Sequence, residues 1–100
     1  MSERANVTVQ DNPEKSRYEA IDDSGVVAGY TEYQPDSADA DVLVFPHTVV
    51  EDGFEGRGVG SALVRGALDQ VRERGQKVRP DCPFVKGYID KHPEYADLLA

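Results

Sequence analysis

The sequence predicts a mixed α+β fold, in which helices pack on a sheet that is mostly antiparallel but contains one parallel strand pair. Alternating or apolar runs separated by polar turns occupy residues 6–50, which predicts strands joined by hairpins. A glycine loop and a long amphipathic run follow at residues 56–74. A short run at residues 76–79 completes a strand–helix–strand unit, whose two strands should lie parallel. At 100 residues, the chain is predicted to form one domain over residues 1–100.

The first three strands are predicted at residues 6–10, 16–21 and 26–34, where apolar and polar side chains alternate. The polar cluster Asp11–Glu14 predicts the first turn. The sequence Asp22-Asp23-Ser24-Gly25 predicts a tight hairpin, because glycine supplies the positive φ that such turns need. These three strands should therefore be antiparallel.

A polar loop at residues 35–41 leads to a fourth strand at residues 42–50. Pro46 lies inside this run and has no N–H to donate to a ladder. We therefore expect a bulge or a break in the strand at Pro46.

Residues 58–74 predict the main helix, because apolar side chains recur every three or four positions. The recurring apolar residues are Val59, Ala62, Leu63, Val64, Ala67, Leu68 and Val71. Gly75 is the expected stop, since glycine is common just after a helix.

The C-terminal segment predicts a short strand at residues 76–79, a break at residues 80–83 and a short helix at residues 84–92. One side of that helix would carry Phe84, Val85, Tyr88 and Ile89. A last turn is expected at residues 94–99.

Composition and charge exclude several classes of protein. The net charge is −8, and residues 1–55 carry 13 acids against 3 bases, whereas residues 56–100 carry 6 acids against 8 bases. An acidic chain without a dense basic stripe is not expected to bind nucleic acid. No run is apolar and long enough to span a membrane, and Met1–Arg4 has no signal-peptide core. With one cysteine and no disulfide, a cytoplasmic location is expected.

The loop at residues 56–60 has glycine at alternate positions and lies directly before the main helix. Glycines allow a ligand to approach bare backbone N–H groups, and the helix directs its first free N–H groups and its positive dipole end at the loop. This arrangement predicts a cradle for phosphate or pyrophosphate. Arg57 either adds a cation to this cradle or is an ordinary solvated arginine.

The strand, glycine loop and helix resemble motif A of the GNAT superfamily of acyl-CoA-dependent N-acetyltransferases, usually written R/Q-x-x-G-x-G/A. Gly58 and Gly60 occupy its glycine positions, and Glu55 departs from its first position. The Cys82-Pro83-Phe84 and His92-Pro93-Glu94-Tyr95 sequences are similar to those of small single-domain GNAT-like proteins of the YjdJ type. The resemblance covers the chain from about residue 15 onward.

The resemblance implies a GNAT fold in which two strands separate into a V that holds acetyl-CoA as cosubstrate. The pyrophosphate would lie on the loop, and the pantetheine would run along the fourth strand. The implied acetyl-CoA-binding residues are Thr48, Val49, Val50, Glu55, Gly56, Arg57, Gly58, Val59, Gly60 and Ser61.

Three residues are candidates for the chemistry of amine acetylation. His47, at the end of the fourth strand, could be the base or a structural histidine bonded to a neighbour. Tyr88, by the resemblance, would protonate the CoA thiolate, but a core tyrosine would show the same pattern. Cys82 could accept the acetyl group, form a mixed disulfide with CoA, or be a small buried hydrophobe.

The favoured function is acetyl-CoA-dependent N-acetylation of an unidentified amine. The alternative is a CoA or acyl-CoA binding module without transferase activity, because only a turn at residues 11–15 occupies the place where larger relatives have helices. A Rossmann-type nucleotide domain fits poorly, since several strands precede the loop. The two histidines have no ligand spacing for a metal site. A monomer or a homodimer is expected.

Overall fold

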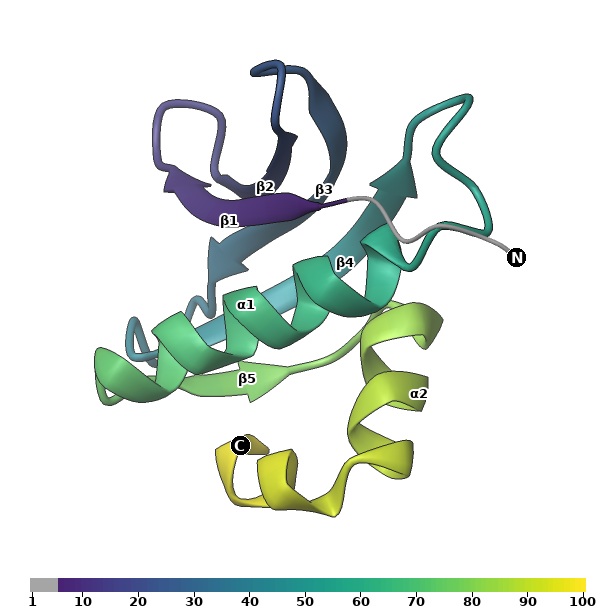
Figure 1. Ribbon diagram of the computed structural model, residues 1–100. Coiled ribbons are helices and arrows are strands. Elements are labelled where there is room, and N and C mark those ends of the chain that lie inside the picture. Colours follow the sequence, from purple (N-terminus) through teal and green to yellow (C-terminus); the bar gives the residue numbers. More distant parts are fainter. Residues whose placement is uncertain (1–5) are drawn as a thin grey trace.

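The computed structural model describes residues 6–100 as a five-stranded sheet with helices packed against it (Figure 1). Residues 1–5, which include the Met1–Arg4 segment expected to lack a signal-peptide core, lie outside the described residues. The strands follow one another across the sheet in chain order. They are β1 (Val7–Asn12), β2 (Arg17–Asp22), β3 (Val27–Pro35), β4 (Val42–Val50) and β5 (Lys77–Arg79).

The first four strands pair antiparallel, and β4 pairs parallel with β5, as the sequence predicts. Helix α1 (Val59–Glu73) follows β4 in the chain, packs across one face of the sheet and leads into β5 (Figure 1). Helix α2 (Pro83–Lys91) and the 3₁₀ helix η1 (Pro93–Leu98) follow β5. The mixed α+β fold class is therefore confirmed.

The apolar stripe predicted on the main helix forms the centre of the core. One side of α1 packs against the sheet, and its buried positions recur with the helical period. The buried residues of α1 are Val59, Gly60, Leu63, Val64, Ala67, Leu68 and Val71. On the sheet, Tyr18, Tyr33 and Phe45 form an aromatic cluster with ring centroids 5.3 to 6.3 Å apart. Burial of this stripe is what holds α1 on the sheet.

The register of β3 and β4 shows which of their residues share a face of the sheet. Thr31 on β3 lies opposite Thr48 on β4, and both face α1; Thr31 is fully buried. Glu32 and His47, the next residues along these strands, are also opposite each other and face the other side. Within residues 6–100, no helix lies over that second face, which we call the uncovered face.

The first predicted turn is wrong by two residues. Asp11 and Asn12 continue β1 and pair with Tyr18 and Arg17, so the turn occupies residues 13–16. Polar residues remain in the strand here because the Asp11 carboxylate accepts a hydrogen bond from the Tyr33 hydroxyl at 2.6 Å. The remaining elements agree with the predicted ranges within one or two residues.

The predicted irregularity at Pro46 is a bulge. Glu32 pairs with His47, but Gln34 pairs with Val44, so β4 has one extra residue beside Pro46. β5 accompanies β4 only as far as Val44. Beyond this point the two segments separate, with one further backbone hydrogen bond from Cys82 N–H to Phe45 C=O at 2.7 Å. The V between β4 and the segment leading into α2 is therefore present.

A polar network ties the C-terminal end of α1 to the strands. The Arg74 guanidinium donates to the Asp11 carboxylate at 2.8 Å and to the Tyr18 hydroxyl at 3.2 Å. Burial, followed by the hydrogen bond to Asp11, raises the pKa of Tyr33 above its ordinary value. Since Asp11 bonds both Tyr33 and Arg74, it links β1, β3 and α1.

The 3₁₀ helix is fastened to the outer side of α1. The Tyr95 hydroxyl donates to Asp69 at 2.6 Å, and Arg72 forms an ion pair with Asp97. Burial is the main cause that raises the pKa of Tyr95 to about 12. Lys77 on β5 donates to the Asp97 carbonyl, so η1 is held at both ends.

Candidate functional site

The glycine loop leaves backbone N–H groups of α1 without partners. Gly56 and Gly58 have φ of 75° and 77°, a region that favours glycine. Gly58 is the N-cap of α1 and provides no side chain, while its carbonyl accepts the Ala62 N–H at 3.1 Å. The N–H groups of the first turn, Val59–Ser61, therefore have no helical acceptor and point toward the loop. With the helix dipole, these groups make the start of α1 suited to an anion.

A hollow of about 270 Å³ lies beside this loop. Its lining residues are Val50, Phe54, Glu55, Gly56, Gly58, Val59, Gly60, Ser61 and Phe84. A Cβ at Gly56 would meet nothing within 4 Å, so glycine keeps space open here. The Glu55 carboxylate accepts the Gly53 N–H at 3.0 Å, and the Arg57 guanidinium lies 5.4 Å from the Phe54 ring centroid. We call this space the loop hollow.

Phe84 forms one wall of the loop hollow. It lies on the side of α2 that faces α1, where its ring tip meets Gly60, and the residue is 45% exposed. A Cβ on Gly60 would lie 2.5 Å from Cζ of Phe84. Gly60 therefore has a packing role, because only glycine lets the ring approach the start of α1.

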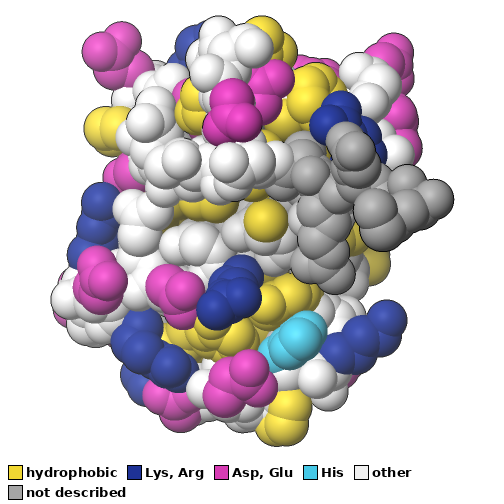
Figure 2. Space-filling model, viewed as in Figure 1, with side chains coloured by type: hydrophobic (Ala, Val, Ile, Leu, Met, Phe, Trp, Pro, Cys, Tyr) yellow, Lys and Arg dark blue, Asp and Glu magenta, His cyan; other side chains and the backbone are white. Residues whose placement is uncertain are grey.

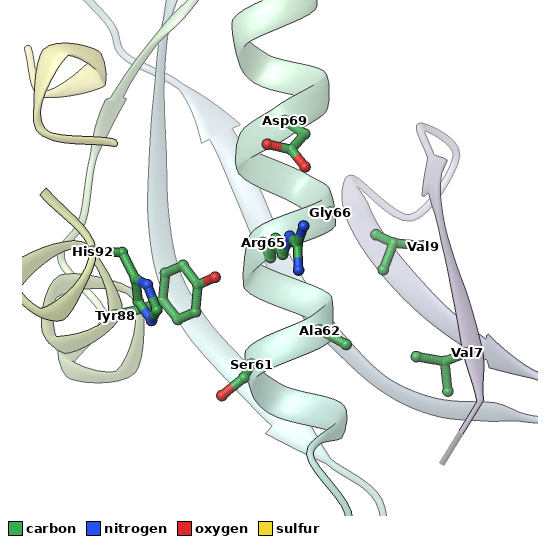
Figure 3. A pocket seen from close by; sticks show the side chains of 9 residues that line it. All are labelled: Val7, Val9, Ser61, Ala62, Arg65, Gly66, Asp69, Tyr88 and His92. Atoms are coloured by element: carbon green, nitrogen blue, oxygen red, sulfur yellow. The ribbon is translucent and has the colours of Figure 1, made fainter. Parts of the chain in front are cut away.

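Two further hollows continue from the loop hollow along α1. One of about 360 Å³ lies against α2 and is lined by Ser61, Pro83, Phe84, Gly87, Tyr88, Lys91 and His92. The other, of about 510 Å³, lies between β1, α1 and α2 (Figure 3). Ser61 lines all three hollows, so they adjoin one another. On the same side of the molecule, basic side chains and a histidine adjoin apolar surface over α1 and α2 (Figure 2).

Cys82 and Thr48 meet at the base of the V. The Cys82 thiol lies 3.3 Å from the Thr48 hydroxyl, which is 2.9 Å from the Thr31 hydroxyl. Cys82 is 5% exposed and forms no disulfide. Val50, two residues after Thr48, lines the loop hollow, so this side of β4 runs from Cys82 to the glycine loop.

His47 lies on the uncovered face, opposite Glu32, and is exposed. Val49 shares that face and lies opposite Tyr30. No hydrogen bond within residues 6–100 joins the His47 side chain to Cys82. The structure therefore brings Cys82 and Thr48 together but leaves His47 on the other side of the strand.

Tyr88 lies apart from Cys82, on the part of α2 that faces α1. Its ring stacks on His92 with centroids 4.1 Å apart, and Figure 3 shows its hydroxyl directed toward α1. Burial raises the pKa of Tyr88 above its ordinary value. Sequence reasoning did not assign Phe84 or Lys91 to this region. The available signal was the short, proline-initiated helix that brings both of them near the glycine loop.

Within residues 6–100, no group of three or more His, Cys, Asp and Glu side chains is arranged to hold a metal ion. None of the helices in that range has the length and apolar character needed to cross a bilayer.

Curated relatives match part of the chain. It is 36% identical over 60 residues to Protein NATD1 from Homo sapiens and to Protein NATD1 from Mus musculus, which covers 58% of this chain. The matched region is 53% of the human and 54% of the mouse protein. The chain thus spans about half the length of the curated relatives that it matches.

Solved structures share the fold. A GCN5-like protein from Staphylococcus aureus superposes with a TM-score of 0.68 at 24% identity, over 95% of this chain and 89% of the other. The GNAT family N-acetyltransferase YhbS from Escherichia coli, solved in complex with CoA, gives a TM-score of 0.60 at 21% identity, over 80% and 63%. At these identities the likeness establishes the GNAT fold. The family model of the GCN5-related N-acetyl-transferases matches residues 17–98. The chain therefore belongs to the GCN5-related N-acetyltransferase family.

Proposed function

We propose that this protein is an acetyl-CoA-dependent N-acetyltransferase that moves an acetyl group to an amine. The observation that carries the proposal is the uncapped start of α1 behind the Gly56 and Gly58 turn, directly beside the V that opens after Val44. An anion-binding position next to an open strand edge suits a ligand with a pyrophosphate at one end and an extended, amide-containing chain. The CoA complex of the E. coli fold relative supports this choice of ligand.

The proposed placement of CoA follows from these two features. Its pyrophosphate would accept hydrogen bonds from the N–H groups of Val59–Ser61, with Arg57 adding charge. Its pantetheine would lie along Thr48–Val50, whose outer edge is not paired with β5. The thioester would then reach the base of the V, where Thr48 meets Cys82.

Two routes for acetyl transfer are compatible with this placement. In direct transfer, the amine attacks the thioester carbonyl, His47 takes the amine proton, and Tyr88 gives a proton to the departing CoA thiolate. Burial favours the protonated form of Tyr88, since it raises the pKa of the phenol. For His47 to serve, the amine must approach from the uncovered face. For Tyr88 to serve, the departing CoA sulfur must lie on the α1 side of α2, away from Cys82.

The second route passes through Cys82. Its thiol sulfur attacks the thioester carbonyl, its proton passes to the departing CoA sulfur, and an acetyl-cysteine thioester results. The amine then attacks this new thioester, His47 removes the amine proton, and the Cys82 thiolate leaves. The contact between Cys82 and Thr48 at the base of the V supports this route.

The second candidate function is a CoA or acyl-CoA binding module. One observation favours it: β1 and β2 are joined by a turn at residues 13–16, and no helix in the described chain walls the uncovered face. The residues proposed to bind CoA are thus in place, while no helix of the described chain encloses the side from which an amine would approach. The two functions share CoA binding and differ in turnover.

The test is a calorimetric titration with acetyl-CoA, followed by intact mass measurement and turnover with a panel of primary amines. We expect micromolar binding and acetylation of at least one amine, reduced by His47→Gln. A mass gain of one acetyl group that Cys82→Ser abolishes would establish the cysteine route, whereas turnover without it would establish direct transfer. Binding without turnover over the whole panel would favour the binding module. Absence of binding would reject both functions.

A further inference from the structure

Three side chains at the base of the V form one hydrogen-bonded chain. The Cys82 thiol lies 3.3 Å from the Thr48 hydroxyl, which lies 2.9 Å from the Thr31 hydroxyl. The Thr31 hydroxyl in turn lies 3.5 Å from the His47 carbonyl oxygen. The chain therefore links β3, β4 and the N-cap of α2. Because Thr31 is fully buried, its hydroxyl must find its partners within the protein.

The direction of this chain follows from its last member. A carbonyl oxygen can only accept, so the Thr31 hydroxyl donates its single proton to the His47 carbonyl. The Cys82 thiol donates to Thr48. The proton between the two hydroxyls is therefore that of Thr48, and it points to Thr31 and away from the sulfur. In this arrangement every donor has an acceptor, and Thr48 offers the sulfur an acceptor only.

The reverse arrangement is also open to the same groups. A thiolate at Cys82 needs a donor, and the Thr48 hydroxyl can turn to supply a charge-assisted one. The Thr31 hydroxyl can then donate to the Thr48 oxygen in place of the His47 carbonyl. The bond given up is the longest of the three, at 3.5 Å, and hence the weakest. Only the rotation of two hydroxyl groups about their C–O bonds separates the two arrangements.

Other polar groups do not bond the thiol. Within residues 6–100, the Thr48 hydroxyl is the hydrogen-bond partner of the Cys82 sulfur, and the Cys82 N–H is held by the Phe45 carbonyl at 2.7 Å. Helix α1 turns its apolar residues toward the sheet. The charged or titratable neighbours on the adjoining segments are His47 and Glu32, which face the other side of the sheet, Asp81, which is exposed, Tyr88, which is directed toward α1, and Arg79 and Lys86, which pair with Asp36 and Asp90.

We propose that Thr31 is a positioning residue that acts through Thr48 on the ionisation of Cys82. While Thr31 accepts the Thr48 proton, the sulfur keeps its own proton; when the two hydroxyls turn, Thr48 donates to the thiolate. The inference deepens the cysteine route of the proposed function and rests on it for its catalytic meaning. In that route the chain holds Cys82 as a thiol until it attacks, and it stabilises the thiolate that leaves when the amine takes the acetyl group. No proton passes along the chain in either step.

The test follows the ultraviolet absorbance of the thiolate as the pH is raised. Cys82 is the one cysteine of the chain, so each protein is compared with the same protein carrying Cys82→Ser, which subtracts the tyrosine signal. Thr31→Val removes the acceptor of the Thr48 proton, which then turns to the sulfur, and the thiolate should appear about one pH unit lower than in the wild type. Thr48→Val removes the donor to the thiolate, which should appear about one pH unit higher.

Two controls separate this role from a loosened sheet. Thr31→Ser retains the hydroxyl and should titrate as the wild type does. Thr8→Val makes the same chemical change at an exposed position of β1 and should also leave the titration unchanged. A loosened sheet would move Thr31→Val and Thr48→Val in one direction, whereas the proposed chain moves them in opposite directions. Circular dichroism over the same pH range confirms that each variant is folded.

The outcomes distinguish this inference from the proposed function, because the titration needs neither acetyl-CoA nor an amine. Opposite shifts in the two valine variants would support the role of Thr31. Shifts of the same sign, or a Thr31→Val titration equal to that of the wild type, would reject that role and leave the proposed function standing. If the shifts are opposite but acetyl-CoA adds no acetyl group to the intact mass of the wild type, the role of Thr31 in the ionisation stands and the cysteine route is wrong.

Discussion

The two ends of helix α1 differ in how many of their backbone N–H groups form hydrogen bonds within the protein. At the C-terminal end, the Gly75 and Gln76 N–H groups return to carbonyls of the last turn, and Arg74 is bonded to Asp11 and Tyr18. At the N-terminal end, Gly58 offers no side-chain cap, and the N–H groups of the first turn have no helical acceptor.

The comparison indicates that one helix serves two purposes. Satisfied groups at its C-terminal end stabilise the fold, whereas unsatisfied groups at its N-terminal end are available to a ligand. Substitutions at the two ends should therefore separate stability from CoA binding. The three predictions below test this separation, from the largest expected effect to the smallest.

The largest effect is expected for Asp11→Ala at the C-terminal end. The change leaves the Tyr33 hydroxyl and Arg74 without their shared acceptor, which should cost about 2 kcal/mol of unfolding free energy. For a domain of this size the melting temperature should fall by roughly 10 °C, measured by thermal denaturation. Below that transition, the affinity for CoA should equal that of the wild type. Weakened CoA binding by the folded variant would break the proposed separation.

A matched pair of glycine substitutions sharpens the comparison. Gly56 and Gly75 have φ of 75° and 71°, and a Cβ at either would meet nothing within 4 Å. Alanine at either position should therefore cost about 1 kcal/mol of unfolding free energy through backbone strain alone. Only Gly56→Ala should also weaken the binding of CoA, by about tenfold, because its methyl group enters the loop hollow. Equal effects of both variants on calorimetric CoA affinity would argue against a ligand at the loop.

The smallest effect is expected for Glu55→Gln. The substitution removes a negative charge beside the proposed pyrophosphate position but keeps an oxygen that can accept the Gly53 N–H. CoA affinity at low salt should rise about threefold, and the gain should shrink as salt is added. Glu51→Gln is the control, since Glu51 does not line the loop hollow. A loss of affinity would mean that Glu55 assists the ligand.

Much of the fold could be predicted because its signals are local. The alternation of apolar and polar residues predicted the strands, and the apolar period of residues 58–74 predicted α1. Pro46 predicted the bulge in β4. Asp11 was assigned to a turn because the segment Asp11–Glu14 has the composition of a turn. Its place in β1 depends on Tyr33 and Arg74, which are distant in sequence, and no local pattern reports such contacts.

The candidate site was only partly predictable. The positive φ of Gly56 and Gly58 follows from residue type. His47 and Thr48 are consecutive in a strand and so must face opposite sides, which the strand period alone could have revealed. The end-on contact of Phe84 with Gly60 could not be predicted, since it depends on how α2 packs against α1. The separation of Tyr88 from Cys82 is different, because it follows from the rise of α2 itself: Cys82 is the N-cap of the helix and Tyr88 lies further along it.

The order of the strands across the sheet has a consequence for folding kinetics. Each antiparallel pair joins strands that are consecutive in the chain, so the loops that must close are short. The parallel pairing of β5, the hydrogen bond from Cys82 to Phe45 and the bridge between Val78 and Leu99 bring the C-terminal segment back to the sheet. A meander of four strands can thus assemble by successive hairpins, while α1 and β5 add later. During synthesis that meander emerges from the ribosome first, and its apolar face stays open until α1 has been made.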